Sequence, residues 1–248
     1  MNRLENKRAL ITGATSGIGI ETARQFLTEG AKVVITGATQ TGLDSARRQL
    51  GDSVIAVASD AGDVASQPKL AETIRQSFGG LDVLVINAGI ADLRPLDQWD
   101  ETSFDRSVSI NFKGPFFLIQ SLLPLFASPA SIVLNASINA HIGMPNTSVY
   151  GASKAALLSL TRTLSGELAA RGIRVNAISP GPIATPLYSK LGLSDQQARS
   201  MAEQLTTQVP AHRFGRPEEI AKTIVFLASD EASFIVGSDV IIDGGLSL

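Results

Sequence analysis

The sequence predicts a doubly wound α/β fold, in which a parallel sheet is covered by helices on both faces. Short apolar runs alternate with longer stretches of helical period, which is typical of repeated strand–helix–strand units. The 248 residues contain no linker rich in Pro, Gly or Ser, and the hydrophobic fraction of 44% and charged fraction of 18% are ordinary for a globular protein. We therefore expect a single domain over residues 1–248.

The strands are predicted where apolar and β-branched residues form short runs bounded by turn residues. Seven such runs are Arg8 to Thr12, Lys32 to Thr36, Val54 to Ala58, Val83 to Asn87, Ser131 to Leu134, Arg174 to Ile178 and Val240 to Ile242. They indicate a seven-stranded sheet.

Helices are predicted between these strands, where apolar residues recur with helical spacing. The ranges are Gly17 to Glu29, Leu43 to Leu50, Gln67 to Phe78, Ser103 to Phe126, Val149 to Ala170 and Pro217 to Ala228. Gly30 and Gly172 follow helix ends, where glycine is a common cap, and Pro217 with two following glutamates is a typical helix start. The segment around 182–210 departs from this alternation, because prolines are followed by a weakly helical polar stretch. We expect it to form a substrate lid over the carboxyl edge of the sheet.

Composition argues against several classes of partner. The formal net charge is −2 and no basic run occurs, so neither nucleic acid nor a membrane surface is an expected partner. The chain has no cysteine, which excludes disulfides and thiolate nucleophiles. No signal peptide and no apolar stretch of membrane-spanning length is visible, so we expect a cytoplasmic protein. His141 and His212 have no partners at metal-ligand spacing, and no metal site is predicted.

The most informative spacing is that of Tyr150 and Lys154. Residues four apart lie on one helix face, so the phenol and the ammonium can converge. A cation about 5 Å away at an effective dielectric of about 20 favours the phenolate by roughly 3 kcal/mol, which lowers the phenol pKa toward neutral pH, where acid–base catalysis works best. The alternative is a surface helix with a tyrosine and a solvated lysine.

A glycine-rich segment directly follows the first predicted strand. Gly13, Gly17 and Gly19 in Thr12-Gly-Ala-Thr-Ser-Gly-Ile-Gly permit a tight turn that brings the backbone close to a phosphate at a helix N-terminus. The spacing differs from the commoner G-x-G-x-x-G pattern, and a glycine-rich turn can be merely a tight connection. Its position between the first strand and the first helix favours dinucleotide binding.

Together with further motifs along the chain, these residues resemble those of the short-chain dehydrogenase/reductase family. The matching motifs are Thr12 to Gly19, Asn87-Ala88-Gly89, Asn111, Ser137, Tyr150 with Lys154, Pro180-Gly181, Gly215 to Ile220 and Asp243-Gly244-Gly245. The resemblance implies a Rossmann-type seven-stranded parallel sheet. It also implies that Ser137 polarises a substrate carbonyl, Tyr150 exchanges the proton, Lys154 lowers the tyrosine pKa and binds the nicotinamide ribose, and Asn111 supports a proton-relay water. Taken singly, Ser137 could be a small residue at a strand end and Asn111 a kink in a helix.

The resemblance also implies a set of cofactor-binding residues. They are Gly13, Thr15, Ser16, Gly17, Ile18, Gly19, Gly37, Ala38, Thr39, Asp60, Ala61, Asn87, Ala88, Gly89, Tyr150, Lys154, Pro180, Gly181, Ile183 and Thr185. Asp60 would bind the adenine amino group, although a solvated loop aspartate is the alternative. Gly37 stands where NAD-preferring relatives carry Asp, and Ser16 and Ala38 stand where many NADP-preferring relatives carry Arg or Lys. The missing carboxylate leaves room for a 2′-phosphate, so we expect NADP, with NAD as the alternative.

The candidate substrate-binding residues are Ser137, Asn139, His141, Met144, Tyr150, Leu187 and Tyr188, with Ile90, Ile138 and Asn146 nearby. They suit a neutral carbonyl better than an anionic one. The predicted function is NAD(P)-dependent interconversion of a ketone and a secondary alcohol. The alternatives are a 3-oxoacyl-carrier-protein reductase, which needs a basic docking surface, and a nicotinamide-sensing regulator without catalysis. The apolar C-terminal tail and the long helices resemble the family's subunit contacts and predict a homotetramer, with a homodimer second.

Overall fold

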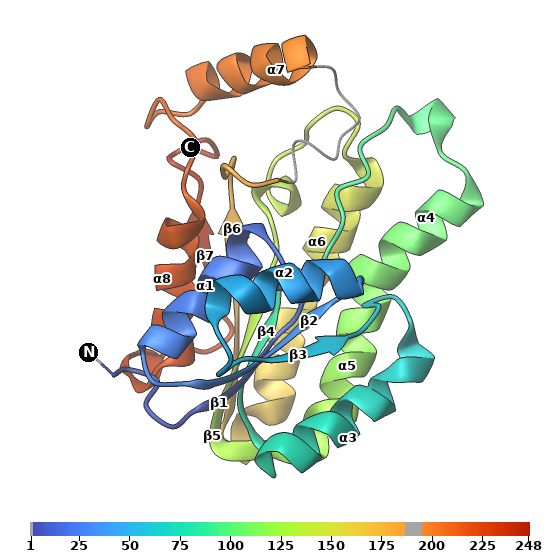
Figure 1. Cartoon of the computed structure of the whole chain (residues 1–248). Coiled ribbons are helices and arrows are strands. Elements are labelled where there is room, and N and C mark those ends of the chain that lie inside the picture. Colours follow the sequence, from blue (N-terminus) through green and yellow to red (C-terminus); the bar gives the residue numbers. More distant parts are fainter. Residues whose placement is uncertain (1, 187–194) are drawn as a thin grey trace.

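The structure is a computed structural model that describes residues 2–186 and 195–248. Its centre is a seven-stranded sheet in the order β3-β2-β1-β4-β5-β6-β7, in which every pair of neighbours is parallel (Figure 1). The strands are β1 (Arg8–Ile11), β2 (Lys32–Gly37), β3 (Ile55–Ala58), β4 (Leu81–Ile86), β5 (Phe126–Asn135), β6 (Ile173–Pro180) and β7 (Asp239–Ile242). The order reverses between β1 and β4, and ligands bind at such a switch point in open α/β sheets.

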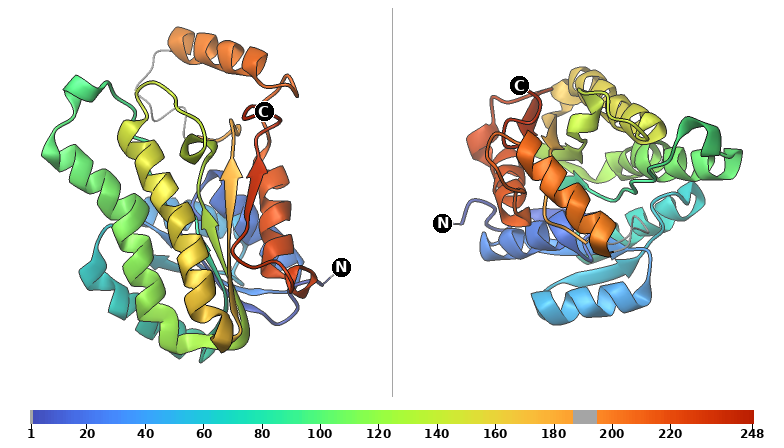
Figure 2. Two further views of the ribbon diagram at one scale, coloured as in Figure 1. Left: turned by 180° about the vertical axis from the view of Figure 1, so that it is seen from behind. Right: turned by 90° about the horizontal axis from the view of Figure 1, so that it is seen from above.

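Helices cover both faces of this sheet (Figure 2). They are α1 (Gly17–Thr28), α2 (Gln40–Leu50), α3 (Gln67–Phe78), α4 (Glu101–Val108), α5 (Gly114–Leu122), α6 (Ser148–Leu168), α7 (Asp195–Gln208) and α8 (Pro217–Ala228). Short 3₁₀ helices span Val64–Ser66, Leu96–Gln98, Leu123–Leu125, Ile138–Ala140, Ala169–Arg171 and Asp230–Ala232. The doubly wound fold predicted from the alternating pattern is confirmed.

The core consists of two apolar layers, one on each face of the sheet. Ala9 and Ile11 of β1 pack in the layer that contains α1, α2 and α8, whereas Leu10 packs in the layer that contains α3, α5 and α6. This division follows from the strand period of two residues, and it explains why the strands read as continuous apolar runs. Burial on both faces holds the carboxyl ends of the strands in fixed relative positions.

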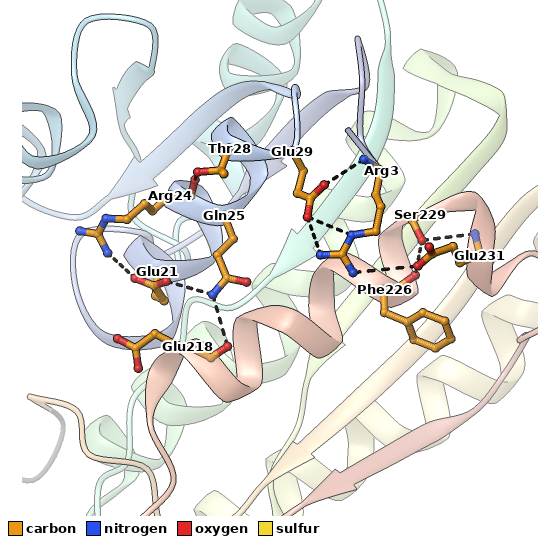
Figure 3. Close-up of polar contacts among 10 residues, drawn as sticks. All are labelled: Arg3, Glu21, Arg24, Gln25, Thr28, Glu29, Glu218, Phe226, Ser229 and Glu231. Atoms are coloured by element: carbon orange, nitrogen blue, oxygen red, sulfur yellow. Dashed lines mark hydrogen bonds and ion pairs between the residues drawn. The ribbon is translucent and has the colours of Figure 1, made fainter. Parts of the chain in front are cut away.

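Polar contacts at the edge of the first layer tie α1 to α8 and to the N-terminal segment (Figure 3). Gln25 donates to the Glu21 carboxylate at 3.0 Å and to the main-chain oxygen of Glu218 at 3.3 Å. Arg3 binds the Glu29 carboxylate through two side-chain nitrogens at 2.9 and 2.6 Å. These contacts fix α1, whose N-terminus faces the site described below.

The long helix predicted over Ser103 to Phe126 is present, but it is not uniform and it ends earlier. The structure has α4, then one turn of π-helix at Ser109–Lys113, then α5, and β5 already begins at Phe126. Gly114 lies so close to the main chain of Ala61 that a side chain at this position would overlap the Ala61 carbonyl. The wider turn therefore accompanies a close contact between α5 and the loop after β3, which helical periodicity alone does not reveal.

Two further helices differ from their predicted bounds. α2 begins at Gln40 rather than Leu43, because the Thr39 hydroxyl accepts a hydrogen bond from the Gly42 amide at 3.2 Å and caps the helix. In the predicted lid, Asp195–Gln208 form the regular helix α7, and Leu205 on it is buried. Figure 1 shows α7 above the carboxyl edge of the sheet. Among the described helices, none is both long and apolar enough to cross a membrane.

Candidate active site

A cavity of about 490 Å³ lies at the carboxyl edge of the sheet. Its walls come from the segments that follow β1, β2, β3, β4, β5 and β6, together with α4, α6, α7 and the C-terminal segment. This volume lies within the range of small-molecule and cofactor sites. The position agrees with the general rule that ligands bind beyond the carboxyl ends of parallel strands.

The glycine turn after β1 is held against the segment after β4 by a dense set of hydrogen bonds. The Thr12 hydroxyl accepts from the amides of Asn87 and Ala88, each at 3.0 Å, and the Asn87 side-chain amide donates to the Thr12 and Gly13 carbonyls, each at 3.0 Å. Gly13 has a φ of +63°, and a Cβ there would lie 2.7 Å from the Cα of Ala88. Both the backbone conformation and the space require glycine at this position.

The start of α1 fits a phosphate group. Ser16, Gly17 and Ile18 line the cavity, and the first turn of the helix contains no acidic residue. The amides at a helix N-terminus lack intrahelical partners and carry partial positive charge, so they bind anions. Gly19 does not line the cavity: a Cβ there would lie 2.5 Å from the Gly13 carbonyl, so it serves close packing instead.

The far end of the cavity fits an adenosine group and explains the missing carboxylate after β2. A Cβ at Gly37 would overlap the methyl group of Thr15, so the site has no room for an acidic side chain at this position unless Thr15 moves. Ala38 lines the cavity and is exposed, whereas Thr39 caps α2 and does not line it. Asp60 and Ala61 line the same end, and one Asp60 oxygen accepts from the Gly62 amide at 2.9 Å.

Ser137, Tyr150 and Lys154 meet at the opposite end of the cavity, as the sequence predicts. Ser137 follows β5, and the other two lie on α6 with the spacing of one helical turn. The Ser137 hydroxyl donates to the Asn139 side chain at 3.1 Å and accepts from the Asn139 amide at 3.2 Å. The Lys154 ammonium donates to the main-chain oxygen of Asn135 at 2.7 Å, and its nitrogen lies 5.8 Å from the centre of the Tyr150 ring.

The predicted lowering of the Tyr150 pKa is wrong for this arrangement. Burial raises the pKa of the phenol, and a hydrogen bond with Ser137 lowers it by less. Lys154 lies beside the ring and donates to Asn135 rather than to the phenol oxygen. Burial also lowers the pKa of Lys154 from 10.5 to about 8. The phenol is therefore protonated at neutral pH and is suited to donate a proton.

Asn111 lies in the π-helical turn and is only 1% exposed. Its side-chain oxygen accepts from the Ile90 amide at 2.9 Å, and its side-chain nitrogen donates to the Ile90 carbonyl at 2.9 Å and to the Ser153 hydroxyl at 3.1 Å. Asn111 thus ties the segment after β4 to α6 beside the candidate catalytic residues. Its role in a proton relay stays a prediction.

Some of the predicted substrate residues line the cavity, and two of them cannot be placed. Ile90, Ile138, Asn139 and Met144 line the cavity beside Ser137 and Tyr150, while Leu187 and Tyr188 fall outside the described residues. The predicted cofactor-binding residues Pro180, Gly181, Ile183 and Thr185 also line it.

His141 and Asn146 do not line the cavity, which corrects the prediction for both. The His141 ring nitrogen Nε2 lies 2.7 Å from the Asp239 carboxylate and 3.3 Å from the Ser179 hydroxyl, so the imidazole binds β6 and β7 instead. Asn146 has a φ of +66°, and its carbonyl accepts from the Arg94 amide at 3.0 Å.

The structure adds lining residues that sequence reasoning missed. They include Ala91, Leu93, Arg106, Ile110, Asn135, Thr147, Leu205 and Leu246. Arg106 and Ile110 are four apart on the segment through α4, so helical spacing would have identified the pair once one member was known. Leu246 comes from the C-terminal segment and carries no sequence signal for this position. Among the described residues, no group of three His, Cys, Asp or Glu could hold a metal ion.

The fold and the cavity are those expected of a dinucleotide-binding protein, and Ser137, Tyr150 and Lys154 line the same cavity as the glycine turn. A family model described as enoyl-(acyl carrier protein) reductase matches residues 13–247. The chain belongs to the short-chain dehydrogenase/reductase family. Members are oxidoreductases that use NAD(H) or NADP(H) and act on small-molecule substrates, so the chain is an enzyme with a nicotinamide cofactor.

Three relatives illustrate the similarity. The chain is 40% identical to oxidoreductase asL5 of Sarocladium schorii, over 100% of this chain and 98% of the relative. It is also 40% identical to the 3-oxoacyl-[acyl-carrier-protein] reductase FabG of Thermotoga maritima, over 98% of this chain and 99% of the relative. The structure of a glucose/ribitol dehydrogenase from Brucella melitensis matches with a TM-score of 0.91 at 37% identity, over 98% of this chain and 97% of that chain. The predicted family and Rossmann-type fold are confirmed.

Proposed function

We propose that this protein interconverts a ketone and a secondary alcohol by NAD(P)-dependent hydride transfer. The observation that carries the proposal is that one cavity is lined both by the glycine turn at the start of α1 and by Ser137, Tyr150 and Lys154. A bound reduced nicotinamide would supply hydride to the carbonyl carbon. The residues of the chain then have to stabilise charge on the carbonyl oxygen and provide a proton.

The three catalytic side chains match these two tasks. The Ser137 hydroxyl is 6% exposed and held by Asn139, so it is oriented before a substrate binds. Tyr150 carries its proton at neutral pH, because burial raises its pKa, and it gives this proton to the oxygen as hydride reaches the carbon. The Lys154 ammonium then stabilises the phenolate that forms. Oxidation of the alcohol follows the same steps in reverse.

The walls of the substrate end favour a neutral ketone. Among the described residues, the charged side chains that line the cavity are Asp60, Arg106 and Lys154. Asp60 follows β3, and Arg106 lies on α4 one turn before Ile110, whose side chain lies close to Gly62 in the loop after β3. Ile138, Met144, Leu205 and Leu246 add apolar side chains to the lining, and Asn139 adds an amide beside Ser137. We propose that α7, with the flanking residues 182–186 and 209–210, forms the substrate lid; residues 187–194 of the predicted lid lie outside the described residues.

The nearest rival function is that of a 3-oxoacyl-carrier-protein reductase, which the relative from Thermotoga maritima carries in its name. A carrier protein is acidic and would need a basic docking surface. Arg94 instead binds Asp92 at 2.7 Å and stacks on Trp99, and Arg213 binds Glu219 at 2.7 Å. These pairs favour a free small ketone. A nicotinamide sensor without catalysis fits less well, because Ser137, Tyr150 and Lys154 are all in place.

We propose NADP as the preferred cofactor. The site has no carboxylate at Gly37 and exposes Ala38 at the position where a 2′-phosphate would lie. Ala38→Arg should strengthen NADPH binding about tenfold through a charge-assisted hydrogen bond, whereas Ala38→Asp should weaken it and favour NADH. Dissociation constants for both cofactors, measured by nicotinamide fluorescence, test this. Gln49→Arg adds the same charge at an exposed position on α2 and should change neither. If both Ala38 variants kept the wild-type ratio of the NADPH and NADH dissociation constants, the assignment of NADP would be contradicted.

We propose a homotetramer that uses two exposed apolar regions. One contains Phe104 and Phe116 on α4 and α5, and the other contains Phe234, Val236 and Ile241 beside and on β7. Such patches mark association surfaces on globular proteins. Light scattering at micromolar protein concentration should give the mass of four chains. A dimer would leave one of the two regions unused, and a monomer would contradict the proposal.

The function is tested by NADPH and NADH consumption with a panel of aryl ketones, diketones and 3-oxoacyl thioesters. We expect turnover with neutral ketones and a lower kcat/KM for the thioesters. Preference for a thioester on acyl carrier protein would support the rival reductase. Tight cofactor binding without turnover of any carbonyl would support the sensor.

A further inference from the structure

Asn135, the last residue of β5, makes two contacts that join the cofactor turn to the catalytic lysine. Its side-chain nitrogen donates to the side-chain oxygen of Asn87 at 2.9 Å. Asn87 must face Asn135 with its oxygen, because its own nitrogen donates to the Thr12 and Gly13 carbonyls at 3.0 Å. The hydrogen-bond network thus fixes the orientation of both amides.

The second contact uses the main chain of the same residue. The Asn135 carbonyl accepts from the Lys154 ammonium at 2.7 Å, and Lys154 is 4% exposed. A continuous chain of hydrogen bonds therefore runs from the Gly13 carbonyl through Asn87 and Asn135 to Lys154. It connects β1, β4, β5 and α6, which are the four elements that carry the site.

The side-chain oxygen of Asn135 has no hydrogen-bond partner in the described part of the chain. The residue is 9% exposed and lines the cavity, and the preceding β5 residues Ile132, Val133 and Leu134 are fully buried apolar side chains. An unpaired buried acceptor is unfavourable, so a polar residue here is not explained by local stability. Its donor group and its position in the chain of hydrogen bonds account for it.

We propose that Asn135 is a positioning residue, which sets the phosphate-binding turn and the Lys154 ammonium at the separation that hydride transfer requires. It acts through Asn87 and Lys154 and does not itself touch the reacting atoms. The proposal rests on the proposed function, since the geometry it maintains is that of a nicotinamide-dependent ketone reductase.

The test compares Asn135→Ala with Asn176→Ala as a matched control. Asn176 on the neighbouring strand β6 is also fully buried, and its amide donates to the Ile235 carbonyl at 2.8 Å and accepts from the Ser238 amide at 3.0 Å, outside the cavity lining. We expect Asn135→Ala to lower kcat/KM about a hundredfold, because small displacements of catalytic groups have effects of this size. We expect Asn176→Ala to lower the melting temperature but to keep kcat/KM within about threefold.

The pH profile of kcat/KM separates positioning from a purely structural role. Asn135→Ala keeps the main-chain carbonyl that accepts from Lys154 but removes the side-chain contact with Asn87 that holds this carbonyl in place. A less well placed acceptor disfavours the ammonium form of Lys154, so the alkaline limb of the profile should move to lower pH. An unshifted profile with kcat/KM within about threefold of wild type would overturn the proposal. If Asn135→Ala does not fold, Asn135→Asp keeps the shape and removes the donor. Its carboxylate should move the same limb to higher pH, and a wild-type profile and rate would again overturn the proposal.

Cofactor binding distinguishes failure of this proposal from failure of the proposed function. NADPH titration without any ketone should show binding about tenfold weaker in Asn135→Ala than in wild type or Asn176→Ala. This comparison holds even if the wild-type protein reduces none of the ketones tested. Equal NADPH affinity in all three proteins would overturn the positioning role, whatever the turnover.

Discussion

Tyr150→Phe is expected to reduce ketone turnover by about a thousandfold, because it removes the group that protonates the substrate oxygen. The phenol lies on α6 beside Ser137, and burial keeps it protonated at neutral pH. Phenylalanine retains the ring and its packing, so the fold and the cofactor site should stay intact. Steady-state kcat at saturating ketone and the NADPH dissociation constant, measured on the same preparation, check both parts of this prediction.

Ser148→Ala is the control for that variant. Ser148 is exposed, lies two residues before Tyr150 on the first turn of α6 and does not line the cavity. Loss of this hydroxyl should leave kcat unchanged. If Tyr150→Phe kept more than about a tenth of wild-type kcat, another group would have to supply the proton, and the assigned mechanism would be wrong.

Lys154→Met is expected to abolish turnover and, at the same time, to stabilise the fold. Lys154 is 4% exposed, and burial lowers its pKa from 10.5 to about 8, which corresponds to an unfavourable contribution of about 3 kcal/mol to the free energy of unfolding at neutral pH. Loss of the hydrogen bond to Asn135 offsets about 1 kcal/mol of this. The free energy of unfolding should therefore increase by about 2 kcal/mol in Lys154→Met, which should raise the melting temperature by about 4–8 °C.

The gain in stability from Lys154→Met should decrease as the pH rises. The unfolded chain keeps the lysine proton until the pH approaches 10.5, whereas the folded protein releases it near pH 8. The stability of the wild-type protein therefore rises between these two values as the penalty disappears. The advantage of Lys154→Met is complete below pH 8 and vanishes by about pH 10.5. Denaturant unfolding at several pH values measures it.

Lys222→Met on α8 serves as the control for charge removal. Lys222 is exposed, so its replacement should change the free energy of unfolding by no more than about 0.5 kcal/mol at any of these pH values. A Lys154→Met protein that is less stable than wild type at neutral pH would show that the ammonium contributes more to the fold than its burial costs.

The fold and the glycine turn were predictable because their signals are local. The short apolar runs of the strands and the position of Gly13 and Gly17 between β1 and α1 depend on adjacent residues alone. The π-helical turn at Ser109–Lys113 was not predictable in the same way, since apolar periodicity continues across it. It accompanies the contact of Gly114 with Ala61, about fifty residues away in sequence.

The chemistry of the site was predictable in its residues but not in its electrostatics. The spacing of Tyr150 and Lys154 places both on one face of α6, but it does not show that the ammonium donates to Asn135 or that burial dominates the phenol pKa. His141 is a similar case. Its position after Ser137 suggested the cavity, whereas Asp239 on β7 draws the imidazole away.

The most direct test of the account follows the hydrogen itself. The wild-type protein is supplied with an aryl ketone and NADPH carrying deuterium at the transferable position, and the alcohol product is analysed by mass spectrometry and NMR. The account predicts one deuterium on the carbinol carbon of the product, with the hydroxyl proton drawn from Tyr150 and exchangeable with solvent. An alcohol without deuterium, or no product although NADPH binds in the cavity, would contradict the assignment of this protein as a ketone reductase.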